Sequence, residues 1–133
     1  MKHKVLIVED EIFAALDLQN TIEDLGQEVV GLAADGGAAY HLAELAEVAF
    51  VDLYLRDGLT GPEIGRRLAG EFGLKVIYLT ANPDLVQAGV AGTIGVLSKP
   101  HSDRTLEETL TFIGLPAAER SLADAPRGLK LFV

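Results

Sequence analysis

Residues 48 to 53 read Val-Ala-Phe-Val-Asp-Leu, and the rest of the chain is organised around them. A short, continuous apolar run with turn residues after it is typical of a strand buried on both faces of a parallel sheet. Asp is depleted in strands and is seldom buried without a partner. Asp52 therefore falls where a core strand ends, at the edge where open parallel sheets bind ligands. If the stretch stood alone, a turn or helix-capping aspartate would explain Asp52 equally well.

The remainder of the chain alternates short apolar runs with segments of helical spacing. Further strands are expected at Lys4 to Val8, Val29 to Ala34, Lys75 to Leu79 and Ile94 to Leu97. Helices are expected at about residues 12–25, 38–46, 62–72, 83–88 and 103–113. The helix at 83–88 is short and runs into glycines, so we expect it to be the least stable element. Five strands and five helices in strict alternation predict an α/β fold, a parallel sheet with helices on both faces.

Composition excludes several classes of protein. With 133 residues the chain can form one domain with a sizeable core. It has no cysteine, which excludes disulfides, thiolate zinc sites and cysteine nucleophiles. The 20 acidic against 11 basic side chains give a net charge of −9, which opposes binding to nucleic acid. No apolar run suits a signal peptide or a membrane span, so we expect a cytoplasmic protein that binds neither nucleic acid nor membrane.

Polar side chains stand at the ends of four of the expected strands. They are Glu9 and Asp10, Asp52, Thr80, and Lys99. In a doubly wound sheet these ends lie along one edge, so residues far apart in sequence can meet in one pocket. Each residue has an ordinary local explanation on its own, but their joint placement indicates one site. In that site Thr80 would donate as a neutral hydroxyl and Lys99 as a point charge, both to phosphoryl oxygens.

The acids among these residues suit a small divalent cation. Mg²⁺ prefers one or two carboxylates together with waters and phosphate oxygens. Asp10, Asp52 and the backbone carbonyl of Tyr54 would be its ligands, and Glu9 would act through a bound water. The cation would offset the repulsion between the carboxylates and polarise an incoming phosphoryl group. Asp52 would be the nucleophile that forms an acyl phosphate.

Four blocks of sequence resemble the signature of a known family. They are Ile-Val-Glu-Asp-Glu at 7–11, Val-Asp-Leu at 51–53, Leu-Thr-Ala at 79–81 and Ser-Lys-Pro at 98–100. Together, over about residues 2 to 113, they resemble the receiver domain of two-component response regulators. The resemblance implies a flavodoxin-like (βα)5 fold with strand order 2-1-3-4-5. It also implies Mg²⁺-dependent phosphoryl transfer to Asp52 from a sensor histidine kinase or phosphotransfer protein, and signalling through the face of the fourth helix, fifth strand and fifth helix.

The sequence departs from this family pattern at one position in the expected fifth strand. Many receivers carry an aromatic switch residue three positions before the lysine, where this chain has Val96. A valine cannot swing a ring between inward and outward positions. We therefore expect Thr80 to be coupled to the output face differently, through movement of the glycine-rich segment at residues 89–95.

The C-terminal residues lie outside the resemblance. We expect residues 1–113 to form the receiver domain and 114–133 an extension without its own fold. The extension is too short for an output domain, so the resemblance is to a stand-alone receiver, monomeric or weakly homodimeric, that acts by contact with a downstream protein. Its apolar end, residues 129–133, would dock on this domain or on a partner, or fray as a free terminus.

Two other functions remain open from sequence. A pseudo-receiver would bind partners without being phosphorylated, and a valine at position 96 is compatible with that function. A small aspartyl-phosphate phosphohydrolase would usually carry a second acid two residues after its nucleophile, where this chain has Tyr54. If the chain is a phospho-accepting receiver, we expect no enzymatic turnover apart from phosphorylation and dephosphorylation of the protein itself.

Overall fold

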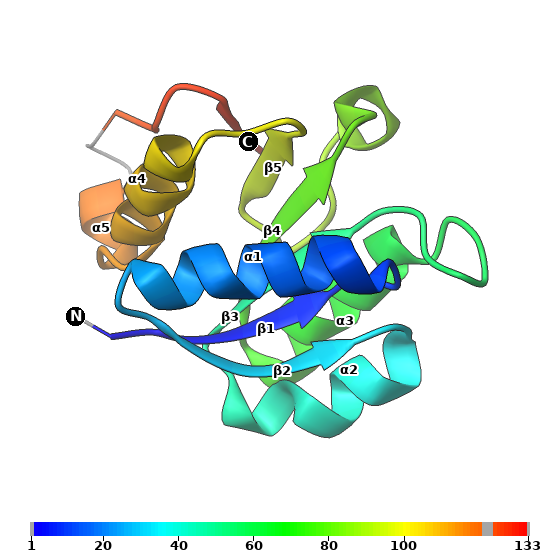
Figure 1. The fold of residues 1–133 in the computed structure, drawn as a ribbon. Helices are drawn as coiled ribbons and strands as arrows, with labels where there is room; N and C mark the ends of the chain where they lie inside the picture. The colour runs from blue at the N-terminus through cyan, green and yellow to red at the C-terminus, as the bar shows by residue number, and fades with distance from the viewer. Residues whose placement is uncertain (1, 121–123, 133) are drawn as a thin grey trace.

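The structure of the protein is a computed structural model that describes residues 2–120 and 124–132. In these residues six strands form one sheet in the order β2-β1-β3-β4-β5-β6 (Figure 1). The strands are β1 (Lys4–Val8), β2 (Glu28–Ala33), β3 (Val48–Asp52), β4 (Lys75–Thr80), β5 (Gly95–Ser98) and β6 (Leu129–Leu131). Strands β1 to β5 run parallel, and their pairing confirms the predicted order 2-1-3-4-5. β6 runs antiparallel to β5.

The helices begin where the sequence offers capping residues. Within the described ranges they are α1 (Ile12–Asp24), α2 (Gly36–Leu42), α3 (Gly61–Phe72), α4 (Asp103–Ile113) and the short α5 (Ala117–Arg120). The Glu11 carboxylate accepts hydrogen bonds from the amides of Phe13 and Ala14 at the start of α1. Ser102 Oγ accepts one from the Thr105 amide at the start of α4. Such caps satisfy amides that have no partner inside the helix.

Apolar side chains form one layer on each face of the sheet. On one face α1 and α4 cover β1 and β3, with Ile22 and Leu106 packed in the same buried cluster as Phe50. On the other face α2 and α3 cover the sheet, with Leu68 in a second cluster that includes Val51. β3 lies between β1 and β4 and is fully buried from Val48 to Val51. The carboxyl end of β3 is therefore held by packing from both sides.

The segment between β4 and β5 differs from the expected helix at 83–88. Pro83–Val86 forms a single 3-10 turn, and no α-helix follows it before β5 in this fully described stretch. Gly89 and Gly92 have φ of +85° and +80°, a left-handed conformation that cannot continue a helix. The helix prediction is wrong because these glycines end the turn before a helical register is established.

The first turns of α1 also differ from a fully buried apolar stripe. Ile12, Phe13 and Leu16 are 54%, 77% and 41% exposed, whereas Ile22 near the other end of the helix is fully buried. These three side chains lie at the end of α1 that follows the acids Glu9 to Glu11. They leave an apolar surface on the molecule rather than adding to its core.

The apolar end of the C-terminal extension lies on this domain, one of the expected alternatives, and pairs with its sheet. Leu129–Leu131 forms β6 along the edge of β5, a strand that the sequence analysis did not anticipate, and Leu129 is 7% exposed. Residues 121–123 and 133 of the extension lie outside the described residues. Among the helices that the structure describes, none is both long and apolar enough to cross a membrane.

Candidate functional site

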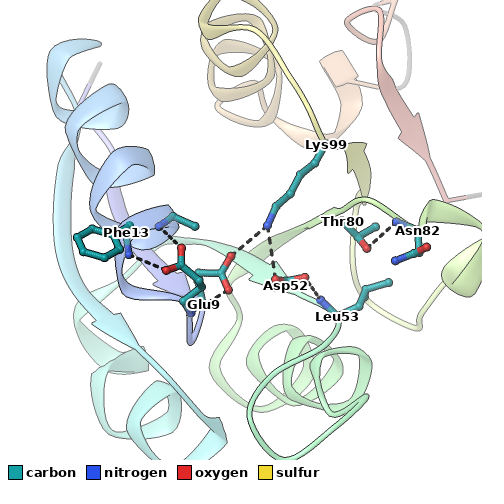
Figure 2. Close-up of polar contacts among 9 residues, drawn as sticks. Glu9, Phe13, Asp52, Leu53, Thr80, Asn82 and Lys99 are labelled. Carbon is teal, nitrogen blue, oxygen red and sulfur yellow. Dashed lines mark hydrogen bonds and ion pairs between the residues drawn. The ribbon is translucent and has the colours of Figure 1, made fainter.

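The polar residues predicted from the strand ends stand along one edge of the sheet (Figure 2). β3 ends at Asp52, β4 ends at Thr80, and Lys99 directly follows β5. The amide of Lys99 donates a 2.8 Å hydrogen bond to the carbonyl of Thr80, which ties the ends of β4 and β5 together. Glu9 follows β1, the neighbour of β3 on its other side. The ends of β1, β3 and β5 thus bring Glu9, Asp52 and Lys99 together, whereas the Thr80 hydroxyl at the end of β4 is paired with the Asn82 amide.

The Lys99 amine links two of the acids. Its Nζ donates to Glu9 Oε1 at 3.0 Å and to Asp52 Oδ2 at 3.5 Å, and Figure 2 shows the lysine reaching between them. The side chains of Glu9, Asp52 and Lys99 are 9%, 19% and 33% exposed. Burial lowers the pKa of Lys99, but the hydrogen bond to Glu9 and the charges of Asp52 and Glu9 outweigh it and raise that pKa above its ordinary value. Lys99 is therefore held as a cation at neutral pH.

The backbone around Asp52 is closely packed. Asp52 Oδ1 accepts a 2.7 Å hydrogen bond from the Leu53 amide, while Oδ2 faces Lys99. A Cβ added at Gly61, the first residue of α3, would lie 2.0 Å from the carbonyl oxygen of Asp52 and 2.6 Å from Leu53 Cα. Only a glycine permits this approach, and a helix predicted to begin at about residue 62 assigned no role to Gly61. The Gly-Pro pair at 61–62 was the available signal.

Thr80 ends the strand that lies between β3 and β5, and a nearby amide holds its hydroxyl. It is 2% exposed, and its Oγ1 accepts a 3.0 Å hydrogen bond from the Asn82 amide. That bond uses a lone pair of the hydroxyl oxygen and leaves its proton for a further acceptor. Asn82 precedes the 3-10 turn without a side-chain capping bond, and its amide helps to hold the Thr80 hydroxyl.

A cavity of about 470 Å³ opens beside these residues. Glu9, Asp52 and Lys99 line one part of it, and Asp17 of α1 and His101 line another. The Nδ1 atom of His101 is buried and has no hydrogen-bond partner among the described residues. The sequence analysis did not single out Asp17 or His101, because neither belongs to a strand end. Their approach to the site depends on how α1 and the start of α4 pack.

The acids of the site fit a small cation held by few protein ligands. Glu9 and Asp52 line the cavity with carboxylate oxygens, Asp10 is half-buried next to Glu9 in the chain but does not line the cavity, and Tyr54 is half exposed two residues after Asp52. Across residues 2–120 and 124–132, no three His, Cys, Asp or Glu side chains converge on one metal position. A cation here would rely on at most two carboxylates, backbone oxygen and water. That donor set suits Mg²⁺, which dehydrates reluctantly and keeps several waters.

Val96 is enclosed within the sheet. It is 1% exposed and lies opposite Tyr78 of β4 on one side and Lys130 of β6 on the other. A side chain in this position has neither the size nor the room to alternate between inward and outward positions. Any coupling of Thr80 to the surface must therefore use other residues.

Fold and site together define a doubly wound α/β protein with an acid–lysine pocket at the carboxyl edge of its sheet. The model of the response regulator receiver domain matches residues 5–111. The chain is 33% identical over 92 residues to the phyllosphere-induced regulator PhyR of Methylorubrum extorquens, covering 67% of this chain and 34% of PhyR. It is 36% identical over 106 residues to the transcriptional regulatory protein PdtaR of Mycobacterium tuberculosis, covering 74% of this chain and 50% of PdtaR.

Solved structures agree with these relatives. The receiver domain of PhyR from Erythrobacter litoralis superposes with a TM-score of 0.73 at 26% identity, covering 83% of this chain and 88% of that one. The receiver domain of the sensor histidine kinase PA1611 from Pseudomonas aeruginosa was determined with magnesium in its active site cleft. It superposes with a TM-score of 0.67 at 27% identity, covering 84% of this chain and 96% of that one. This chain belongs to the response regulator receiver domain family. It spans between about a third and a half of the length of the curated relatives it matches.

Proposed function

We propose that this receiver domain accepts a phosphoryl group on Asp52 from the phosphohistidine of a sensor histidine kinase or phosphotransfer protein. The observation that carries the proposal is the Lys99 amine, 3.0 Å from Glu9 and 3.5 Å from Asp52. An incoming phosphoryl group would add up to about two negative charges beside carboxylates that already repel it. A lysine held charged at this point supplies the compensating charge where the group must sit.

The transfer follows from the groups present. A carboxylate oxygen of Asp52 attacks phosphorus, the P–N bond of the phosphohistidine breaks, and the leaving imidazole takes up a proton. Lys99 and the Thr80 hydroxyl donate to the phosphoryl oxygens as they pass between the two groups. Mg²⁺, held by Asp10, Asp52 and the Tyr54 carbonyl, would neutralise further charge on those oxygens.

The exposed start of α1 supports a protein as the phosphoryl donor. Ile12, Phe13 and Leu16 project from the helix that begins just after Glu9 to Glu11, and other residues of α1 line the cavity beside Asp52. An apolar surface of a kinase that covers these side chains would bring its histidine over the site. We propose that output is also by protein contact; one related structure is described as the anti-anti-sigma factor PhyR from Bartonella quintana.

The direct test is phosphorylation with a small donor. The protein is incubated with Mg²⁺ and acetyl phosphate, and its intact mass is followed. We expect one phosphoryl group per chain, lost in Asp52→Asn and retained in Asp57→Asn, a matched change at an exposed acid five residues later. Removal of Mg²⁺ with a chelator should abolish the labelling.

Other results of this experiment would assign the other functions. Absence of any label in the wild-type protein would contradict the proposal and favour a pseudo-receiver. Repeated turnover of a small phosphate ester, with no accumulation of phosphoprotein, would indicate a phosphohydrolase. We propose no such turnover, because residue 54, where a second acid would be expected, is a half-exposed tyrosine.

A further inference from the structure

The C-terminal strand β6 takes no part in the site described above. It pairs with β5 through Leu131 opposite Gly95, Lys130 opposite Val96 and Leu129 opposite Leu97. The amide of the next residue, Phe132, donates a 2.9 Å hydrogen bond to the carbonyl of Ile94. Figure 1 shows this end of the chain lying beside β5.

Phe132 packs beside the segment between β4 and β5, which forms only a single 3-10 turn. Its partly buried side chain contacts the cluster of α2 and α3, and its ring centroid lies 6.3 Å from that of the buried Tyr78. A Cβ added at Gly89, in the irregular segment after Pro83–Val86, would lie 3.4 Å from Phe132 Cβ. Phe132 therefore rests on both β4 and the segment that joins β4 to β5.

The β5 edge is shaped for this close approach. A Cβ added at Gly95 would lie 2.4 Å from the Lys130 carbonyl oxygen, so a side chain there would push β6 away. β6 is nevertheless only three residues long, and its central Lys130 is exposed. Short strands at an edge have few contacts to hold them and open more readily than central strands.

Both segments in contact with β6 and Phe132 run directly into the site. β5 continues through Ser98 into Lys99, and the segment on which Phe132 rests begins just after Thr80. The hydrogen bond between the Lys99 amide and the Thr80 carbonyl couples the two segments. A phosphoryl group that draws Lys99 away from Glu9, and draws the Thr80 hydroxyl toward itself, would pull on both supports of the C-terminal strand.

We propose that β6 and Phe132 form a displaceable cover over the β5 edge, which is loosened when Asp52 is phosphorylated. The cover replaces the ring movement that Val96 cannot make. Once uncovered, the edge accepts an extended segment of a partner protein, with apolar residues at alternate positions and an aromatic residue at its end, as in Leu129 to Phe132. This inference rests on the proposed function, because Asp52 must bind a phosphoryl group for the cover to move.

Hydrogen exchange of the full-length chain tests the coupling. Exchange is measured with and without Mg²⁺ and beryllofluoride, a phosphoryl mimic, in peptides that cover residues 79–82, 93–98 and 128–132. We expect altered exchange at 79–82, which reports binding of the mimic, and several-fold faster exchange at 93–98 and 128–132. Asp52→Asn should show none of these changes. Phe132→Ala should exchange faster at 93–98 without the mimic and should still bind it.

The outcomes separate the two proposals. Altered exchange at 79–82, with unchanged or slower exchange at 93–98 and 128–132, would overturn the displaceable cover and leave phosphorylation of Asp52 standing. No change in any segment would overturn both. A labelled peptide of residues 127–133 probes the uncovered edge, and should bind the mimic-loaded protein more tightly than the free protein. Equal binding of that peptide and of one with serine in place of Leu131 and Phe132 would overturn the strand-accepting edge.

Discussion

Replacement of Gly61 with alanine should disturb the backbone that carries the phosphoacceptor. The added Cβ would lie 2.0 Å from the carbonyl oxygen of Asp52, whereas ordinary contacts begin at 3.4 Å. The start of α3 would therefore have to move from β3 by more than about 1 Å. Backbone atoms cannot rotate aside as a side chain can, so we expect the free energy of unfolding to fall by about 2–3 kcal/mol. This is the upper part of the range of losses seen when an extra group is forced into a packed site.

Urea unfolding followed by circular dichroism measures this loss. With a slope of about 2 kcal/mol per molar urea, the midpoint for Gly61→Ala should fall by about 1–1.5 M. Gly70→Ala is the matched control, because Gly70 lies exposed in the same helix and a Cβ there meets nothing within 4 Å. The control should gain about 0.5–1 kcal/mol. An unchanged midpoint for Gly61→Ala, with phosphorylation of Asp52 at the wild-type rate, would refute the argument that this approach positions the site.

Two further substitutions, and the pH dependence of one of them, test the energetics of the structure. Lys99→Met leaves the Glu9 and Asp52 carboxylates without their shared cation, so the free energy of unfolding should fall by about 1–3 kcal/mol in the absence of Mg²⁺. Mg²⁺ should restore part of this loss. Equal stability of the two proteins would show that the ion pair does not stabilise the fold. Because the pKa of Lys99 is raised on folding, the stability that Lys99 contributes is fully present below its ordinary pKa of 10.5 and is lost as the pH rises through the folded-state pKa. The difference in free energy of unfolding between wild type and Lys99→Met should therefore shrink above about pH 10.5. Tyr78→Phe removes the hydrogen bond from the phenol to the Pro62 carbonyl at 2.8 Å, and a thermal melt should show a loss of about 1 kcal/mol, whereas a neutral result would show that this bond contributes no net stability.

Local sequence pattern was sufficient for the fold class and the five parallel strands. The apolar run at 48–51, the alternation of strand and helix, and the acid after each early strand are local features, and the connection rules for parallel strands convert them into one sheet with one polar edge. Ser102 as the cap of the last helix could be predicted for the same reason, since capping depends on residues three apart. The candidate site residues could be proposed from the sequence because strand ends of a parallel sheet must share an edge.

Contacts between distant segments could not be obtained in this way. Lys99 donates to Glu9, 90 residues earlier, and that choice of partner depends on side-chain directions at the edge. The approach of Gly61 to Asp52 depends on how closely α3 docks on β3, and the buried Nδ1 of His101 depends on how α1 and α4 enclose the cavity. None of these contacts leaves a period or a spacing in the sequence.

The C-terminal strand β6 shows most clearly which features can be predicted from the sequence and which depend on packing. Leu129 to Phe132 carries an alternating apolar pattern, which allows a strand but names no partner for it. β5 offers an open edge because it is the last of the parallel strands, and Gly95 lets another backbone come close. Periodicity and turn chemistry thus establish the elements and the polar edge, whereas the pairings that close the sheet and position its charges arise from packing, since they depend on surfaces that exist only after the chain has folded.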